Sequence, residues 1–352
     1  MRFIGNKKKL IPNIYQVMQD KNIIGNSIFD CFCGAVSVGK FFKQLGYQVI
    51  SNDLLYFSFA LQKAYIENNQ IPMFNKLINS SYIENNTLFE TPLNQVVGYL
   101  NNLPLSEGFI FQNYTPEGTK YLAQPRMYFS NENGKKIDSI RKQIEEWKIA
   151  NLINELEYFI LLTCLIESVP FYANITGTYA TFHKQWDSRA LKKFQLRPIE
   201  LILNKKENYV FNNNSVDLLN EIEADIFYLD PPYNQRQYAA YYHLLETITK
   251  YDNPEITGIS GLRNYKPQKS LFCNTKTALQ ELYKIAKDGK YKVLILSYNT
   301  EGIMPQYDIL SILNQFGKVE IVEFDYLRFK SNNNGDSKNK KYIQEQLYIL
   351  QR

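Results

Sequence analysis

The residues best suited to chemistry follow the strand-like run "DIFYL" and are Asp230, Pro231, Pro232 and Tyr233. Consecutive prolines fix the backbone angle φ at two positions and remove two N–H donors, so the chain must leave the sheet with its carbonyl groups free. A carboxylate, free carbonyls and a flat aromatic ring then meet at the carboxyl edge of a strand. Because open α/β sheets bind their ligands at that edge, this stretch predicts a ligand site.

Methylation of an amino group explains these residue types. The exocyclic amine of a nucleobase is a poor nucleophile, since its lone pair is delocalised into the ring. If Asp230 and the Pro231 carbonyl accept its two N–H protons, the nitrogen is favoured as a tetrahedral centre with its lone pair aimed at a methyl donor. Tyr233 can hold the base by stacking. A sulfonium methyl donor already carries a good leaving group, so this chemistry needs no metal.

A second candidate site lies in "FDCFCGAVSVG", Phe29 to Gly39. A glycine just after a strand lets the backbone approach a ligand, and the next helix offers free N–H groups. A plain strand-to-helix turn explains the same letters equally well. Asp53 ends the following strand, where nucleotide-binding folds place the acid that grips ribose hydroxyls. Together these features favour a nucleoside cofactor, with a capping role for Asp53 as the alternative.

Hydrophobic patterning predicts the elements that position these residues. Strands are expected at Ser27–Phe32 and Tyr47–Asp53, around a helix at Val38–Gly46. Helical stretches such as Asn151–Ser168 then dominate an inserted segment. Loops are expected there at Leu103–Gly118 and Ser130–Lys136.

Alternation typical of strands returns in the second half of the chain. Further strands are expected at Asn208–Leu219, Asp225–Asp230, Tyr291–Asn299, Val319–Phe329 and Glu345–Leu350. Helical segments between the first four indicate a mostly parallel sheet. The last two should pair antiparallel around a polar loop, Lys330–Lys341, which we expect to be mobile without a partner. The predicted class is a doubly wound α/β fold.

Composition sets broad limits. The chain has 352 residues, 45% of them hydrophobic, and a net charge of +5, which permits a polyanion partner without requiring one. Its four cysteines show neither a C-x-x-C pair nor zinc-ligand spacing, so no disulfide framework or zinc site is expected. The longest apolar run, Phe159–Ile166, is too short to span a membrane, and no signal peptide is visible. We expect a cytoplasmic protein.

Four stretches resemble a known family. "RFIGNKKKL", "FDCFCGAVSVG", "ISND" and "DIFYLDPPYNQRQYAAYYHLLETI" occur in the order seen in alpha-class, D12-type adenine-N6 DNA methyltransferases, which use S-adenosylmethionine. "GTYATFHK" and "LSYN" also look familial, and the form of the DPPY stretch is closest to modification enzymes of restriction-modification systems. The resemblance implies a Rossmann-like catalytic domain at 1–58 and 196–352 and a mainly helical target recognition domain at 59–195.

The resemblance also implies roles for single residues. For the cofactor these are Phe3 and Lys7 at its amino-acid end, Asp30, Phe32 and Gly34 at its methionine side, Asp53 at its ribose, Asn214 near its adenine, and Asp230 beside the methyl group. Val36 departs from the family, whose loop often has a second glycine there. Asn214 is a second departure, since the family often has an acid at that position.

Nucleic-acid contacts are expected mainly from the insertion. Arginine pairs well with guanine and asparagine with adenine, which makes Arg126 and Asn131 candidate base contacts. "GTYATFHK" resembles a family segment that touches DNA, which adds Tyr179, His183 and Lys184 as candidates, and Arg236 is a further candidate. A solvated surface is the ordinary role of a lysine such as Lys184, and His243, within a predicted helix, is expected to be structural.

The predicted function is transfer of a methyl group from S-adenosylmethionine to N6 of a flipped adenine in a specific double-stranded DNA site. The chain would be the modification half of a restriction-modification system and a monomer in solution, with a cognate endonuclease acting on the same site. Alternatives are cytosine-N4 methylation, adenine methylation of RNA, and a non-catalytic DNA-binding protein on the same fold. No metal and no membrane partner are expected.

Overall fold

The computed structural model describes residues 7–79, 90–327 and 342–352. The chain divides into two compact units. The sheet unit contains the described residues up to Asn69 together with Ile202–Ala239 and Lys266–Arg352. The helical unit contains those of Gln70–Leu201 and Ala240–Tyr265. Phe3 and the whole of the loop Lys330–Lys341, which was predicted to be mobile, lie outside the described residues.

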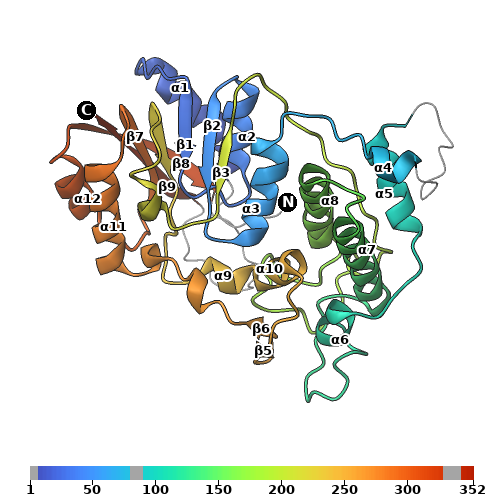
Figure 1. The fold of residues 1–352 in the computed structure, drawn as a ribbon. Coiled ribbons are helices and arrows are strands. Elements are labelled where there is room, and N and C mark those ends of the chain that lie inside the picture. The colour runs from blue at the N-terminus through green and yellow to red at the C-terminus, as the bar shows by residue number, and fades with distance from the viewer. Residues whose placement is uncertain (1–6, 80–89, 328–341) are drawn as a thin grey trace. The chain divides into compact units, whose positions relative to one another are not determined.

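A seven-stranded sheet forms the centre of the sheet unit (Figure 1). Its order is β3-β2-β1-β4-β7-β9-β8. The strands are β1 Ser27–Asp30, β2 Gln48–Asn52, β3 Tyr209–Phe211, β4 Ile226–Leu229, β7 Val293–Asn299, β8 Lys318–Leu327 and β9 Tyr342–Gln351. The first five in spatial order pair in parallel, whereas β9 pairs antiparallel with β7 and β8. The predicted mostly parallel sheet with a C-terminal antiparallel hairpin is therefore confirmed.

The centre of the sheet is apolar on both faces. Every residue of β4 and β7 is buried, as is typical of parallel strands covered by helices on both sides. Helices α11 Thr275–Asp288 and α12 Gln306–Leu313 cover the face that carries Phe29, Phe227 and Leu294. Figure 1 shows α2 Ser37–Gln44 and α3 Tyr56–Gln62 on the opposite side. The unit also holds α1 Ile11–Asp20 and a π-helical turn, Lys63–Glu67.

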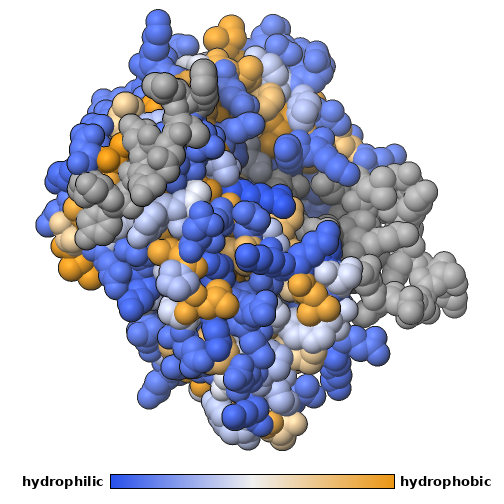
Figure 2. Space-filling model, turned by 90° about the vertical axis from the view of Figure 1, so that its right-hand side faces the viewer, coloured by the Kyte–Doolittle hydropathy of each residue, from blue (hydrophilic) through white to orange (hydrophobic). Residues whose placement is uncertain are grey.

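The helical unit is built around α7 and α8. Its helices are α4 Asn75–Asn79, α5 Pro92–Asn102, α6 Phe109–Tyr114, α7 Asn131–Ile149, α8 Glu155–Ser168 and α10 His243–Lys250, and a small hairpin joins β5 Ile256–Thr257 to β6 Leu262–Arg263. Asn154 and Glu157 form a capping box that starts α8. On the face in Figure 2, hydrophilic side chains predominate and hydrophobic ones are scattered. No helix among the described residues is long and apolar enough to cross a membrane.

Two predicted loops contain helix instead. Ser130 caps α7 by accepting a hydrogen bond from the Asn133 amide, so the predicted loop Ser130–Lys136 is the first part of a long helix. Gly134 lies inside that helix because Thr115 leaves no room for a larger residue: a Cβ atom at this position would come within 2.4 Å of the Thr115 side chain. Within the predicted loop Leu103–Gly118, the short helix α6 packs against α7. Close packing against Thr115, rather than a turn, accounts for Gly134.

The division into units differs from the expected boundaries in one main respect. The segment Ala240–Tyr265 follows the DPPY stretch in sequence but packs within the helical unit. The Arg141 side chain donates to the Ile248 carbonyl, and the Tyr114 hydroxyl donates to the Gly261 carbonyl. The helical unit is thus made from two separate stretches of chain.

Candidate active site

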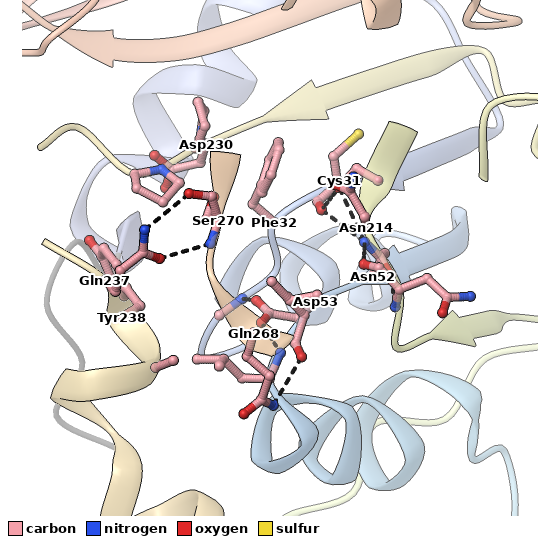
Figure 3. Close-up of a pocket in the computed structure, with 18 of the residues that line it drawn as sticks. Cys31, Phe32, Asn52, Asp53, Asn214, Asp230, Gln237, Tyr238, Gln268 and Ser270 are labelled. Atoms are coloured by element: carbon pink, nitrogen blue, oxygen red, sulfur yellow. Dashed lines mark hydrogen bonds between the residues drawn. The ribbon is translucent and has the colours of Figure 1, made fainter. Parts of the chain in front are cut away.

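A cleft opens at the carboxyl ends of β1, β2 and β4 in the sheet unit. Its volume, open solvent included, is about 770 Å³. The lining residues are 31, 32, 34, 52–55, 213–215, 230–233, 237–239, 268 and 270. In the view of Figure 3, Asp230 and Gln237 lie on one side of Phe32, and Asn52 and Asn214 lie on the other. Five predicted cofactor residues therefore line one cleft: Phe32, Gly34, Asp53, Asn214 and Asp230.

Asp53 connects two loops at the rim of this cleft. One carboxylate oxygen accepts the Gly34 amide at 2.8 Å and the other accepts the Leu55 amide at 2.9 Å. Gly34 has a positive φ of 49°, as a tight turn after β1 requires. Each carboxylate oxygen has a further lone pair, so Asp53 can cap the turn and also accept a hydrogen bond from a ligand.

Val36 adopts the left-handed conformation that would favour the glycine often found at this position in the family. Its φ is 61° and its side chain is fully buried. A β-branched residue in the left-handed region costs about 1–3 kcal/mol, which the surrounding packing must offset. The departure from the family pattern therefore changes the residue but leaves the turn left-handed.

Asn52 holds the opposite wall of the cleft. Its amide group donates to the Asn213 carbonyl at 2.9 Å, and its oxygen accepts the Asn213 amide at 3.0 Å. Ser215 also contacts Asn52 and donates to the Cys31 carbonyl at 2.7 Å. These bonds fix the loop that presents Asn214 to the cleft. The sequence hinted at Asn52 only by its position at a strand end.

Asp30 lies directly behind the cleft at the end of β1, with 1% of its surface exposed. Neither carboxylate oxygen makes a close hydrogen bond with the described residues, although the amides of Gly39 and Phe32 lie near enough to favour its charge. Burial raises its pKa well above the ordinary value, the charges of Asp230 and Asp53 raise it further, and the amides of Gly39 and Phe32 offset only part of this. A buried acid whose charge is only partly compensated fits a cationic group, such as the ammonium of an amino-acid ligand.

The DPPY corner is a cluster of charged and hydroxyl groups in which Lys7 and Glu345 are buried and Asp230 and Tyr233 are half-buried. The Tyr233 hydroxyl donates to Asp230 Oδ1 and lies 3.2 Å from Glu345 Oε1. Lys7 Nζ lies 3.5 Å from Asp230 Oδ1 and forms an ion pair with Glu345. Burial raises the pKa of Asp230 to about 6; Lys7 opposes this shift and Glu345 adds to it. Lys7 therefore faces Asp230, and Glu345 is a member of the cluster that the sequence did not indicate.

The remaining wall comes from segments that are distant in sequence. Gln237 and Ser270 form reciprocal hydrogen bonds of 3.1 and 2.8 Å, and Gln268 donates to the Leu54 carbonyl at 3.3 Å (Figure 3). Gln237 and Tyr238 belong to the stretch that continues the DPPY motif. No local pattern marks Gln268 or Ser270, because the chain passes through the helical unit before it returns to the cleft.

Two predicted DNA contacts are buried within the helical unit. The Arg126 guanidinium is 5% exposed and donates to the carbonyls of Asn113, Gly258 and Ile259. Tyr179 is 1% exposed, and its carbonyl accepts the Tyr128 hydroxyl. These contacts correct both predictions, since neither side chain is available to a base. The sequence around Arg126 gave no sign that its guanidinium would donate to carbonyls in Ala240–Tyr265.

The other predicted contacts are more accessible. Lys184 and Arg236 are exposed, in the helical and the sheet unit respectively, and His183 is half-buried. Asn131 is half-buried as the first residue of α7, where its side chain accepts the Glu117 amide at 3.1 Å. His243 is fully buried, and burial lowers its pKa to about 4, so it is neutral and structural.

The fold and the cleft together define a Rossmann-like methyltransferase architecture: a mostly parallel sheet with an acid-Pro-Pro-Tyr corner beside a ligand site at its carboxyl edge. The chain belongs to the family described as D12 class N6 adenine-specific DNA methyltransferase, whose model matches residues 3–299.

Curated relatives agree with this assignment. The type II methyltransferase M.FokI of Planomicrobium okeanokoites is 40% identical over 359 residues, which cover 100% of this chain and 53% of that protein. The modification methylase StsI of Streptococcus sanguinis is 40% identical over 360 residues, which cover 100% of this chain and 52% of that protein. The type II methyltransferase M.NlaIII of Neisseria lactamica is 35% identical over 358 residues and 99% covered. The chain thus spans about half the length of the first two relatives and nearly all of the third.

Proposed function

We propose that this chain transfers a methyl group from S-adenosylmethionine to N6 of an adenine in double-stranded DNA. The observation that carries the proposal is the corner where Asp230 and Tyr233 meet, next to a cleft that can hold a nucleoside. Family membership supports the choice of adenine N6 over cytosine N4. Since that nitrogen is hidden in the duplex, the base must flip out of the stack, at a cost of a few kcal/mol.

The residues of the cleft fit the proposed cofactor. Asp53 would accept the ribose hydroxyls, Asn214 would contact the adenine edge, and the buried Asp30 would receive the amino group. When bound, S-adenosylmethionine supplies an activated methyl group on a sulfonium. The chain's own residues hold that group in place and keep water away from it.

The Asp230 corner acts on the target amine. Asp230 and the Pro231 carbonyl accept its N–H protons and so direct the nitrogen lone pair toward the methyl group. The Tyr233 ring stacks on the flipped base. With a pKa of about 6, Asp230 is ionised at neutral pH and is basic enough to receive the proton that the amine releases.

Labelled-methyl transfer to DNA tests this function, with the modified nucleosides identified by mass spectrometry. Wild-type protein should yield N6-methyladenine, and Asp230→Ala should yield none while still binding the cofactor. The exposed Asp20, on α1, provides a matched control, and Asp20→Ala should retain full activity. A product on cytosine, or normal turnover by Asp230→Ala, would overturn the proposal.

The helical unit is the proposed target recognition domain. Asn131, His183 and Lys184 are its remaining candidate contacts, and Arg236 is a candidate from the sheet unit. Phosphate contacts should supply much of the affinity, so binding should weaken steeply as salt rises. Sequencing of modified bases in DNA from cells that express the chain would give the target site.

The wider role is modification within a restriction-modification system. The names of the relatives support this role, which requires an endonuclease that cuts the same site. Expression of the chain should protect cellular DNA from that endonuclease. Cleavage at sites that are fully methylated would show that the endonuclease is not the partner of this methyltransferase. We expect a monomer in solution, which light scattering can test.

A further inference from the structure

Glu345 lies at the DPPY corner although it comes from β9, more than a hundred residues further along the chain. It is 2% exposed. A single oxygen, Oε1, receives Lys7 Nζ, the Tyr233 hydroxyl at 3.2 Å and the Ser297 hydroxyl at 3.1 Å. A buried ion pair seldom contributes more stability than apolar side chains of the same volume. Stability alone therefore does not explain this carboxylate.

Two of these donors are shared with Asp230. The Tyr233 hydroxyl reaches both Asp230 Oδ1 and Glu345 Oε1, and Lys7 Nζ likewise lies near both oxygens. A phenol has one proton, so Tyr233 can donate to only one of the two acids at a time. While it donates to Asp230, it occupies an acceptor oxygen that a target amine needs.

We propose that Glu345 is a positioning residue for methyl transfer: it takes over the Tyr233 hydroxyl and the Lys7 ammonium when the target amine engages Asp230. The inference rests on the proposed function. Both donors already lie within reach of Glu345, so the exchange needs little movement. Ser297 holds the accepting oxygen in place throughout.

The charges around Asp230 give this role a measurable consequence. Among the described residues, the titratable groups that face Asp230 are Lys7, Glu345, Tyr233, Tyr228 and Asp30. Lys7 favours the ionised form of Asp230 and Glu345 disfavours it. Removing either charge should therefore shift the ionisation of Asp230, and the two shifts should have opposite signs.

Steady-state kinetics of two substitutions test the positioning role. Glu345→Gln keeps a carbonyl oxygen for all three donors, and its kcat at pH 8 should stay within about threefold of wild type. Glu345→Ala leaves both shared donors on Asp230, and its kcat should fall at least about tenfold with the KM for S-adenosylmethionine unchanged. Wild-type kinetics in a folded Glu345→Ala protein would overturn the proposal.

The pH dependence of kcat provides a second test, which does not require Glu345→Ala to fold. The acid limb of kcat should move to lower pH by about one unit in Glu345→Gln and to higher pH in Lys7→Met. Glu323, on the adjacent strand β8, accepts the Gln346 side chain at 2.7 Å and is the matched control. Glu323→Gln should leave the limb in place.

Nuclear magnetic resonance of protein labelled with ¹³C-aspartate reports the same ionisation without cofactor or DNA. Asp230→Asn identifies the Asp230 carboxyl signal. The titration midpoint should fall in Glu345→Gln and rise in Lys7→Met. Equal midpoints in wild type and Glu345→Gln would refute the inference even if wild type is active. An inactive wild type would instead refute the proposed function.

Discussion

The carboxyl group of Asp230 lowers the stability of the folded protein at neutral pH. Its folded pKa is about 6, above the value near 3.9 of an unfolded aspartate, so the folded protein binds more protons between these values. The free energy of unfolding therefore falls as pH rises from about 4 to about 6, and the cost of the charged group is fully present above that range.

Asp230→Asn should accordingly be inactive but more stable than wild type above pH 6, by on the order of 3 kcal/mol. The gain should shrink toward zero as pH falls to about 4. Scanning calorimetry across this pH range measures it, with the exposed Asp20→Asn as control. A less stable Asp230→Asn at pH 8 would show that the neutral amide disrupts the corner by more than the charge costs.

Asp53 should act on cofactor affinity. On the proposed ribose contact, loss of its carboxylate would leave two ribose hydroxyls without a charged partner and should cost about 1.5–3 kcal/mol of binding. Because Asp53 also caps the Gly34 and Leu55 amides, part of any loss in Asp53→Ala could come from the loop.

A deoxyribose analogue of S-adenosylhomocysteine separates the two contributions by calorimetry. Wild type should prefer the ribose form, and Asp53→Ala should bind both forms equally. A preference that persists in Asp53→Ala would assign the residue to the loop alone.

Residues in a local motif could be predicted, and residues that depend on the return of the chain could not. Asp53 and Asp230 each follow a recognisable strand, so their place in the cleft follows from the sheet order. Glu345 and Ser270 reach the site only through long-range packing. Arg126 was misassigned for the same reason, since its partners lie in another stretch of sequence.

At the scale of elements, Arg126 clamps the turn between β5 and β6. Its guanidinium donates to the Gly258 and Ile259 carbonyls in that turn and to the Asn113 carbonyl on α6. Arg126→Leu should remove the donors for three carbonyls and destabilise the helical unit by on the order of 3 kcal/mol.

Tryptophan fluorescence during urea unfolding isolates this effect, since both tryptophans, Trp147 and Trp186, lie in the helical unit. Lys184→Ala, at an exposed position, should change the midpoint little. Unchanged stability combined with weaker discrimination between DNA sequences would restore Arg126 as a base contact.

The elements themselves could be predicted well where periodicity was continuous. The buried strands β4 and β7 and the long helix α8 lie within predicted segments. The early part of α7 could not be predicted, because glycine is typical of loops. Only the structure shows that Thr115 packs against Gly134 within the helix. Likewise, Val36 adopts a left-handed conformation that its residue type disfavours.

At the scale of the whole molecule, the two units are interleaved in sequence. The helical unit needs Gln70–Leu201 and Ala240–Tyr265 together, since Arg126, Arg141 and Tyr114 each donate from the first stretch to the second. The sequence marked the first stretch by its lack of strands. It did not mark the second, because α10 resembles the helix that ordinarily follows a strand in a parallel sheet.

A chimera should therefore move the methylated site only if both stretches are exchanged with those of a relative. Exchange of Gln70–Leu201 alone pairs foreign side chains with native carbonyls and should lower the urea midpoint of the tryptophan signal. The two-stretch chimera should fold, bind S-adenosylmethionine as wild type does, and methylate adenine N6 at the relative's site. Sequencing of modified bases decides the outcome. If an active two-stretch chimera keeps the original site, recognition must come from the sheet unit, with the segment that joins β8 to β9 as the first candidate.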